Sequence, residues 1–364
     1  MKISVITVCY NSEETIERTI KSVIAQDYDE LEYIIIDGAS ADGTLDIIGR
    51  YRDKISVCVS EPDFGLYDAM NKGLERVSGE VFAFLNSDDY YADNVLRRVN
   101  ECFQNSDADM VSGNMFICKN GVTTKAVYNK NKKENMFFQV VYPHPALFAK
   151  RELYKKYGGF DTSYKIAADS EWVMRVCFKG AKVLCVEDYF TYFSAGGLSS
   201  RKMYAALEEQ YHVALKYAQL DKYTYMESEI QEFYSIELKK MEIRERYRNA
   251  LEMRIEDVRK GFDYNHGYYI WGIGNRGREC LQSFEKLGLR VAGFIDSYAE
   301  TKEFMGYRVI KPGDIDNEKL ICITPIGYEE EIICELKDRG IGKNRYFTYS
   351  DMVDAIMRLG EVEK

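Results

Sequence analysis

Runs of β-branched and aliphatic residues alternate with amphipathic segments through the first quarter of the chain. The expected strands are 3–9, 31–38, 55–61 and 80–86, and the expected helices are about 11–27, 44–52 and 67–77. Strands that alternate with helices form parallel βαβ units, in which helices cover both faces of the sheet. This pattern predicts an α/β fold with a mostly parallel sheet. Ligands of such folds bind at the carboxyl ends of the strands.

Polar and acidic residues stand at these strand ends. The fourth strand is followed by two adjacent carboxylates, Asp88 and Asp89, and the second strand ends near Asp37. Neighbouring carboxylates repel each other unless a cation lies between them. Mg²⁺ and Mn²⁺ prefer oxygen ligands, commonly one or two carboxylates together with substrate phosphates. A turn or a helix cap is the other interpretation of such a pair, but its position at a strand end favours a divalent cation.

Composition narrows the class of protein. The 364 residues are 46% hydrophobic and carry a formal net charge of −10, so the chain is globular and does not resemble a basic nucleic-acid-binding protein. The nine cysteines show no C-x-x-C pair, which favours free thiols in a reducing compartment. The N-terminus soon becomes polar, and no apolar run reaches about 18 residues. We therefore expect a cytoplasmic protein, free or peripheral at the inner face of the plasma membrane.

The sequence changes character twice, which predicts three parts: 1–200, a helical linker or arm at 201–264, and a small Rossmann-like domain at 265–364. The middle part is long, charged and free of proline, and Lys and Arg outnumber Asp and Glu between 239 and 260. An ordinary solvated helix face, a surface for anionic lipid and an arm that forms a homodimer all fit this charge.

A glycine-rich turn opens the last part. Gly272, Gly274 and Gly277 follow a predicted strand and precede a predicted helix, and Asp296 ends the next strand. This is the context of a dinucleotide-binding turn, in which glycines admit phosphate and the acid binds ribose. The domain is small, however, and a docking or regulatory role without a bound nucleotide is the other interpretation.

Two stretches carry a resemblance to a known family. "SVITVCYNSEETIERTIKSVIAQDYDELEYIIIDGASADGT" (4–44) and "GEVFAFLNSDDYY" (79–91) resemble the inverting family 2 glycosyltransferases, which have the GT-A fold. The resemblance covers roughly residues 1–200. It implies transfer of a sugar from a nucleotide-sugar donor, most often a UDP-sugar, to a hydroxyl group of a saccharide or lipid-linked saccharide. It also implies a Mn²⁺ or Mg²⁺ cofactor and a place in surface polysaccharide biosynthesis.

The resemblance assigns roles to residues at the strand ends. The nucleoside of the donor is expected to contact Thr7, Tyr10, Asp37 and Glu61. The Asp-x-Asp motif of the family falls on Asn86-Ser87-Asp88, which makes Asp88 the expected metal ligand, with Ser87 and Asp89 beside the donor. Asn86 replaces the first acid of the motif, and an amide binds a cation more weakly than a carboxylate does.

The stretch "GLYDAMNKG" (65–73) resembles the family's segment near the diphosphate. Met70 stands where many members carry Arg, and we expect Asp68 or Lys72 to compensate.

An inverting transfer needs a general base for the acceptor hydroxyl. The stretch "GGFDTSYKIAADSEWVMR" (158–175) resembles the family's acidic region, with Asp169 as the base and Glu171 as a second acid that contacts substrate. From the residues alone, Asp169 fits equally as the N-cap of an apolar helix. His144 lies between two prolines, and either an acceptor or phosphate contact or a structural role suits it.

Two other functions remain open from the sequence alone. A non-catalytic sensor of sugar nucleotides would use the C-terminal domain as its output. An NAD-dependent oxidoreductase acting on sugar nucleotides would use the glycine-rich turn for catalysis.

Overall fold

The computed structural model describes residues 1–119, 121–128, 133–197, 202–219, 223–251, 265–316 and 318–352. The chain divides into two compact units, Met1–Tyr234 and Ser235–Lys364. Each unit is described by itself below. The three-part division at 200 and 264 stays a prediction, and part of the predicted arm, 252–264, lies outside the described residues.

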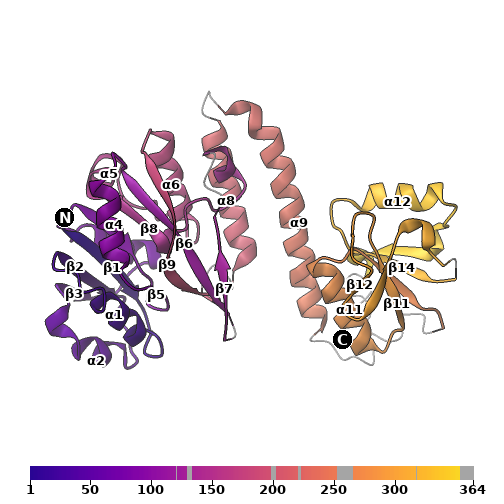
Figure 1. Cartoon of the computed structure of the whole chain (residues 1–364), viewed down its shortest axis with the longest axis horizontal. Coiled ribbons are helices and arrows are strands. Elements are labelled where there is room, and N and C mark those ends of the chain that lie inside the picture. Colours follow the sequence, from indigo (N-terminus) through magenta and orange to yellow (C-terminus); the bar gives the residue numbers. More distant parts are fainter. Residues whose placement is uncertain are drawn as a thin grey trace. The chain divides into compact units, whose positions relative to one another are not determined.

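A single mixed sheet forms the centre of the first unit (Figure 1). Its strands are β1 (Ile3–Cys9), β2 (Leu31–Asp37), β3 (Val57–Ser60), β4 (Val81–Phe84), β5 (Tyr90–Tyr91), β6 (Met110–Lys119), β7 (Val122–Ala126), β8 (Leu147–Lys150) and β9 (Val183–Ser194). Their order is β3-β2-β1-β4-β8-β6-β9-β5, and β7 pairs with β6. The α/β fold predicted from the alternation is confirmed.

The strands β3, β2, β1 and β4 are parallel, as the alternation predicted. Beyond β4 the sheet becomes mixed, because β8 runs antiparallel to both β4 and β6. In register, Cys9 lies opposite Asp37 and Asp37 lies opposite Ser60. The last residues of the parallel strands therefore meet at one edge of the sheet.

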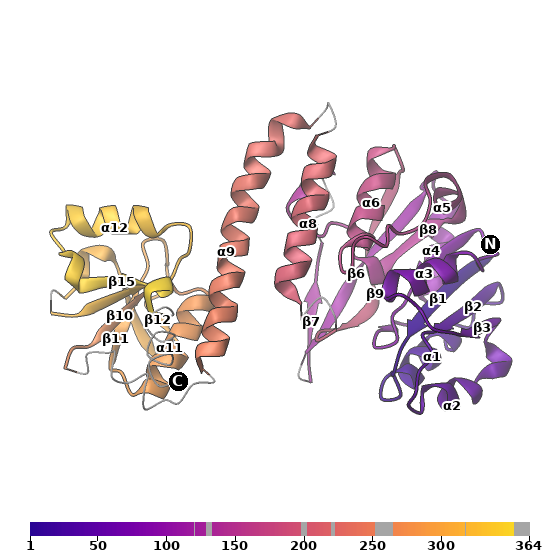
Figure 2. The same ribbon diagram turned by 180° about the vertical axis from the view of Figure 1, so that it is seen from behind.

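Helices cover both faces of this sheet (Figure 2). They are α1 (Ile16–Ile24), α2 (Thr44–Gly49), α3 (Leu66–Leu74), α4 (Val95–Gln104), α5 (Arg151–Tyr157), α6 (Ala168–Phe178) and α8 (Met203–Ala218), with short 3₁₀ turns at Arg52–Lys54, Lys133–Phe137, His144–Ala146 and Thr224–Met226. One core joins a face of the sheet to α3, α6 and α8, and the other joins the opposite face to α1 and α4. Ile6 and Val5, neighbours in β1, point into different cores, as the alternation of a strand requires.

The described part of the predicted helical segment 201–264 contains the α-helices α8 and α9. α8 and the first part of α9 (Glu227–Leu251) belong to the first unit, and the rest of α9 belongs to the second. Val213, Tyr217 and Ile230 are buried in the core that also contains α6. In the part of the chain that the structure describes, no helix combines the length and apolarity that a membrane crossing requires.

The second unit has a smaller sheet in the order β12-β13-β11-β10-β14-β15. Its elements are β10 (Tyr268–Trp271), α11 (Asn275–Leu287), β11 (Val291–Ile295), β12 (Glu303–Phe304), β13 (Tyr307–Ile310), β14 (Leu320–Ile323), α12 (Glu329–Asp338) and β15 (Tyr346–Thr348), with 3₁₀ turns at Pro312–Asp314 and Lys343–Arg345. All pairings except β12–β13 are parallel. β10 lies between β11 and β14, so the strand order reverses beside it.

The helix α3 packs closely on β1 at Gly73. A Cβ at Gly73 would lie 2.5 Å from Cγ2 of Ile6, whereas a Cβ at Gly49 in α2 would meet nothing within 4 Å. Gly73→Ala should lower the free energy of unfolding of the first unit by about 1–2 kcal/mol, because overpacking outweighs the better helix propensity of Ala. Gly49→Ala, the control, should leave it unchanged or raise it by up to about 1 kcal/mol.

The chain has two tryptophans, so urea unfolding in a Trp271→Phe background makes Trp172 the reporter of the first unit. Equal stability of Gly73→Ala and Gly49→Ala would contradict the tight contact between α3 and β1.

Candidate active site

The carboxyl edge of the parallel strands is tied together by backbone hydrogen bonds beyond the strands themselves. Gly38 N–H donates to the Cys9 carbonyl (2.9 Å), and Glu61 N–H donates to the Asp37 carbonyl (3.0 Å). Leu85 N–H donates to the Ile6 carbonyl (2.9 Å), which carries the segment after β4 alongside β1. The loops that contain the predicted site residues therefore start from fixed positions.

Asp37 is fully buried at this edge, and its carboxylate accepts several hydrogen bonds. Ser40 donates through both its hydroxyl (2.5 Å) and its N–H (3.0 Å), and the Ser60 hydroxyl donates from β3 (2.6 Å). These donors replace the water that the carboxylate loses on burial. Asp37 thus fixes the loop after β2 against β3, and the structure gives its side chain no exposed surface.

The other predicted nucleoside contacts lie in different environments. Thr7 is buried in β1 with its hydroxyl 3.1 Å from the Tyr33 hydroxyl, whereas Tyr10 at the strand end is 62% exposed. Glu61 is exposed and pairs with Lys72 (3.1 Å), which also pairs with Asp68 (3.5 Å). Tyr10 and the Lys72 cluster are therefore open to a ligand, and Thr7 is not.

The two acids in the segment after β4 differ in their burial. The carboxylate of the half-buried Asp88 lies beside Gly197, where an added Cβ would be 3.5 Å from Asp88 Oδ2. Asp89 has no exposed surface, and Oδ1 accepts a hydrogen bond from Ser194 N–H (2.8 Å). Burial and the nearby Asp88 charge raise the pKa of the Asp89 carboxyl well above its usual range. Asp89 thus ties this turn to the end of β9.

Other side chains that the sequence analysis did not single out hold the same turn. Arg18 in α1 donates to the Asp88 carbonyl (2.7 Å) and to the Ser194 hydroxyl (3.2 Å), and its guanidinium lies over the Tyr90 ring. The Thr19 hydroxyl lies 2.6 Å from the Asp89 carbonyl. Ser87, a predicted site residue, has its hydroxyl 2.9 Å from that of Ser12. These contacts join elements far apart in the sequence, so no local pattern predicts them.

The oxygen atoms at this turn suit a hard divalent cation. Asn86 Oδ1 and Asp89 Oδ2 are buried without a hydrogen-bond partner, and Asp88 is the acid between them that is not fully buried. Among the described residues, no group of three His, Cys, Asp or Glu side chains forms a complete metal site. Mg²⁺ and Mn²⁺ commonly take one or two carboxylates and complete their shell with substrate phosphates and water. The residues present therefore fit a cation that binds together with a diphosphate.

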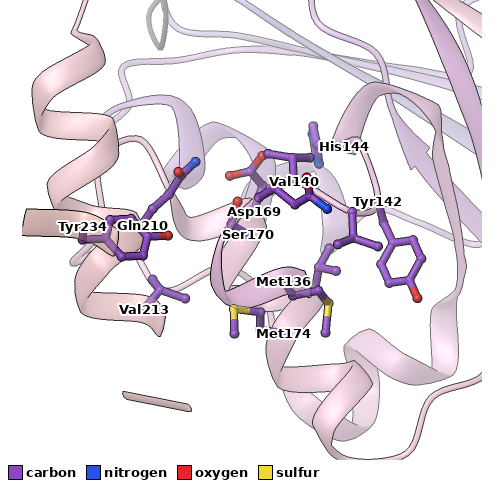
Figure 3. Close-up of a pocket in the computed structure, with 13 residues that line it drawn as sticks. Met136, Val140, Tyr142, His144, Asp169, Ser170, Met174, Gln210, Val213 and Tyr234 are labelled. Carbon is purple, nitrogen blue, oxygen red and sulfur yellow. The ribbon is translucent and has the colours of Figure 1, made fainter. Parts of the chain in front are cut away.

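Asp169 lies in a pocket between α6, α8 and the segment before β8 (Figure 3). The pocket is lined by Met136, Gln139, Val140, Val141, Tyr142, His144, Asp169, Ser170, Val173, Met174, Gln210, Val213 and Tyr234. Most of these side chains are apolar, and Asp169 is the one acid among these lining residues. Asp88 is not among them, so the structure does not place the predicted metal ligand and the predicted base in one pocket.

The Tyr67 side chain supports Asp169. The Tyr67 hydroxyl at the start of α3 lies 3.0 Å from Asp169 Oδ1 and 2.5 Å from the Ile166 carbonyl, so one proton serves two acceptors. Burial first, and the Asp169 charge second, raise the pKa of Tyr67. Through Tyr67, α3 links Asp169 to the carboxyl edge of the parallel strands.

His144 begins the 3₁₀ turn His144–Ala146, and the strand β8 begins only after this turn, at Leu147. Its ring stacks on Phe84, the last residue of β4 (centroids 5.4 Å apart), and Nε2 is buried without a partner. Burial lowers the pKa of His144 against the opposing effect of Asp169. Because its pKa lies below the ordinary value of 6.5, the imidazole of His144 is neutral at pH 7.

The interpretation of Asp169 as a helix N-cap is wrong. α6 begins at Ala168 with Ala167 as its N-cap, and Asp169 lies in the first turn. A residue of α8 binds the N–H groups of the N-cap residue Ala167 and of the two residues that precede it. Glu209 accepts hydrogen bonds from the N–H groups of Lys165, Ile166 and Ala167 (2.8–3.0 Å). The Asp169 carboxylate therefore does not cap the helix.

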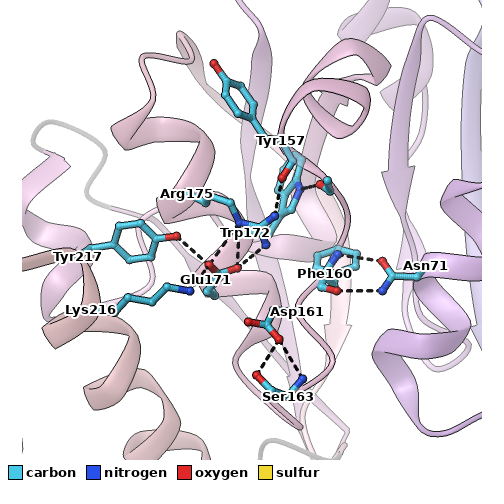
Figure 4. A network of polar contacts seen from close by, with 11 residues as sticks. Asn71, Tyr157, Phe160, Asp161, Ser163, Glu171, Trp172, Arg175, Lys216 and Tyr217 are labelled. Carbon is cyan, nitrogen blue, oxygen red and sulfur yellow. Dashed lines mark hydrogen bonds and ion pairs between the residues drawn. The ribbon is translucent and has the colours of Figure 1, made fainter. Parts of the chain in front are cut away.

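Glu171 has a different environment from Asp169, although only one residue separates them. Figure 4 shows the Glu171 carboxylate among the side chains of Arg175, Lys216 and Tyr217. The Glu171 side chain is 1% exposed and accepts from Arg175 (2.5 Å), Lys216 (2.9 Å) and Tyr217 (2.7 Å). Burial alone would raise the pKa of Glu171, but the hydrogen bonds from Arg175, Lys216 and Tyr217 outweigh it and lower the pKa. The predicted substrate contact from Glu171 is not visible here: the carboxylate joins α6 to α8.

The remaining predicted residues, Gly272, Gly274, Gly277 and Asp296, lie in the second unit, around a separate cavity.

The mixed sheet and its covering helices match the fold of the GT-A transferases. S. aureus TarS, solved with UDP-GlcNAc, shares the fold with a TM-score of 0.52 and 22% identity, covering 65% of this chain and 71% of that one. The family model "Glycosyl transferase family 2" matches residues 4–165.

An uncharacterised glycosyltransferase of Mycobacterium tuberculosis is 33% identical over 179 residues, covering 48% of this chain and 68% of the relative. The putative teichuronic acid biosynthesis glycosyltransferase TuaG of Bacillus subtilis is 41% identical over 99 residues, covering 26% and 39%. The chain belongs to glycosyl transferase family 2, as the resemblance predicted. It is a glycosyltransferase, so neither the sensor nor the oxidoreductase describes its main activity.

The Glu171 network gives a pH-dependent prediction. The folded-state pKa of Glu171 lies below its ordinary value of 4.5, so its stabilising effect is complete above about pH 4.5 and is lost as the pH falls through the folded-state value. Glu171→Gln should lower the free energy of unfolding at pH 7 by about 3 kcal/mol, because it removes the buried carboxylate that pairs with the partly exposed Arg175 and Lys216. The difference from the wild type should shrink below pH 4.5.

Urea unfolding reported by Trp172 at several pH values measures this difference. Glu75→Gln, whose side chain is 68% exposed, is the control and should behave as the wild type at every pH. A loss for Glu171→Gln that stays constant from pH 7 to pH 3 would contradict the account.

Proposed function

We propose that this glycosyltransferase moves a sugar from a UDP-sugar to a hydroxyl acceptor with inversion at the anomeric carbon. The observation that carries the proposal is the location of Asp169. Asp169 is the acid among the residues that line the pocket between α6 and α8, and its carboxylate lies within hydrogen-bond distance of the Tyr67 hydroxyl. The nearby Glu171 forms a buried ion pair with Arg175 instead.

The donor side of the proposal uses the edge of the parallel strands. The exposed Tyr10 and the Glu61–Lys72–Asp68 cluster surround the place where a nucleoside and its diphosphate would lie. Asp37 and Thr7, both buried, act by shaping this edge rather than by direct contact. UDP is the first nucleotide to test, because the TarS structure that shares the fold holds UDP-GlcNAc.

Asp88 would hold a Mg²⁺ or Mn²⁺ ion, which would supply positive charge to the diphosphate as it leaves. Asp89, Arg18 and Ser194 would keep the Asp88 backbone in place, because all three bind within this turn. A fixed turn matters, since charge stabilisation in a transition state requires groups that are already oriented.

In an inverting reaction, the acceptor oxygen attacks the anomeric carbon from the face opposite the diphosphate. The C–O bond to the acceptor forms, the C–O bond to the diphosphate breaks, and the acceptor proton passes to Asp169. The Tyr67 hydroxyl would hold the Asp169 carboxylate in place, and the His144 ring lines the same pocket. The apolar lining of the pocket excludes water that would otherwise compete with the acceptor.

The acceptor is proposed as a saccharide or lipid-linked saccharide of a cell-surface polymer. The similarity to TuaG, whose name refers to teichuronic acid biosynthesis, supports this context.

The general base is tested with Asp169→Asn. The rate of UDP release from UDP-sugars, with water or a saccharide as acceptor, should fall about 10²–10⁴-fold, because an amide cannot accept the proton. The dissociation constant for the donor should stay unchanged. Asp161→Asn is the matched control: this carboxylate lies in the same segment and binds Ser163, so its loss should alter the rate by less than about threefold.

Wild-type turnover by Asp169→Asn would remove the base from its proposed role. If the wild type itself binds UDP-sugars but does not turn them over with any acceptor, the proposed reaction fails as a whole.

A further inference from the structure

We propose that the second unit binds a nucleotide through its phosphates, in a cavity that is separate from the glycosyltransferase site. The cavity has a volume of about 480 Å³, within the range of small-molecule sites. It is lined by Glu237, Lys240, Met241, Gly272, Ile273, Gly274, Asn275, Arg276, Gly277, Glu279, Asp296, Thr324, Pro325 and Tyr349. Its residues all belong to the second unit.

The cavity lies where the topology of an open parallel sheet favours a ligand. β10 leads through α11 to β11 on one side and has β14 on its other side. The cavity residues Gly272, Asp296 and Thr324 each follow directly after one of these three strands. The strand order reverses at this point, and the crevice outside such strand ends is the usual ligand site of doubly wound sheets.

The glycine-rich turn is shaped to leave space next to the helix. Gly277 packs so closely that an added Cβ would lie 2.1 Å from the Gly272 carbonyl oxygen, which brings the start of α11 against the turn. Gly274 is the N-cap of α11, and no side chain caps the helix there. A Cβ at Gly274 would meet nothing within 4 Å. The first N–H groups of a 13-residue helix are thus left for a ligand oxygen.

A cation and an acid stand at positions that suit phosphate and ribose. Arg276 is half-buried in the cavity lining and makes no hydrogen bond or ion pair within the part of the chain that the structure describes. Burial lowers the pKa of its guanidinium against the opposing charges of Glu237 and Glu279. Lys240 is paired with Glu237 (2.5 Å), so Arg276 is the cation of this lining that a phosphate would satisfy.

Asp296 lines the same cavity and follows β11, the strand next to β10. Its Oδ1 accepts from the N–H groups of Tyr298 (2.9 Å) and Ala299 (2.7 Å), which fixes the carboxylate at the end of β11. A carboxylate at this strand end is the group that binds ribose hydroxyls in dinucleotide-binding turns. Phosphate at Arg276 and α11, with ribose at Asp296, defines the ligand as a nucleotide. Its source is either the nucleoside diphosphate that the transferase releases or an adenine nucleotide such as NAD.

Two substitutions test the site without disturbing close packing. Gly274→Asp adds a favourable N-cap to α11 but places a negative charge where the phosphate would lie. Arg276→Ala removes the cation. Arg278→Ala is the matched control, because Arg278 is exposed on the same helix and does not line the cavity.

Hydrogen–deuterium exchange on the full chain reports the site directly in peptides that cover residues 270–282, with UDP, ADP, NAD⁺ and inorganic pyrophosphate as probes. We expect at least one of the nucleotides to slow exchange there in the wild type and in Arg278→Ala. UDP alone would indicate the product of the transfer, and ADP or NAD⁺ alone would indicate an adenine nucleotide. Gly274→Asp and Arg276→Ala should weaken the apparent affinity about tenfold or more.

The proposal is overturned if no nucleotide protects these peptides, if pyrophosphate alone does so, or if both substitutions leave the affinity unchanged. The measurement is independent of sugar transfer, since it follows peptides of the second unit only.

Discussion

Parallel pairing in register is the constraint on which the active-site account depends. β1 pairs with β2 and β4, and β2 pairs with β3, all in the same direction. Every loop that follows one of these strands must therefore start at the same edge of the sheet. This constraint brings Tyr10, Asp37 and Asp88 to one edge, although the chain separates them widely. The Tyr67 hydroxyl then connects α6, which carries Asp169, to the same edge.

The acids around this edge have different roles, structural or catalytic, because their burial and hydrogen-bond partners differ. Asp37 and Glu171 are buried but are surrounded by donors, so each holds elements together. Asp89 is buried with one carboxylate oxygen left without a partner next to Asp88, a costly arrangement that a nearby cation would relieve. Asp169 is half-buried and faces a pocket. Burial and hydrogen-bond partners, rather than residue type, distinguish structural acids from candidate catalytic ones.

The sequence predicted the parallel strands, the helices between them and the family, because local periodicity and short motifs carry that information. It could not show that Glu171 pairs with Arg175, Lys216 and Tyr217, since two of these partners lie on a helix distant in the chain. The N-cap interpretation of Asp169 was wrong because α6 begins one residue earlier, at Ala168, with Ala167 as its N-cap. Arg18 and Tyr67 were missed because each acts through a contact between distant elements.

In the second unit, too, the sequence shows local features but not the contacts between distant segments. The spacing of Gly272, Gly274 and Gly277 is visible in the sequence, but the cavity and the unpaired Arg276 within the described residues depend on three strands meeting. The proposed nucleotide site therefore belongs to a different unit from the proposed active site.

The most direct test of the central claim is a crystal structure of the full chain with Mn²⁺ and a non-hydrolysable UDP-sugar, with anomalous scattering used to locate the metal. The account predicts a Mn²⁺ peak within bonding distance of the Asp88 carboxylate and the diphosphate, with the anomeric carbon of the sugar turned toward Asp169. Donor bound elsewhere, or a metal peak away from Asp88 with the sugar facing away from Asp169, would contradict it.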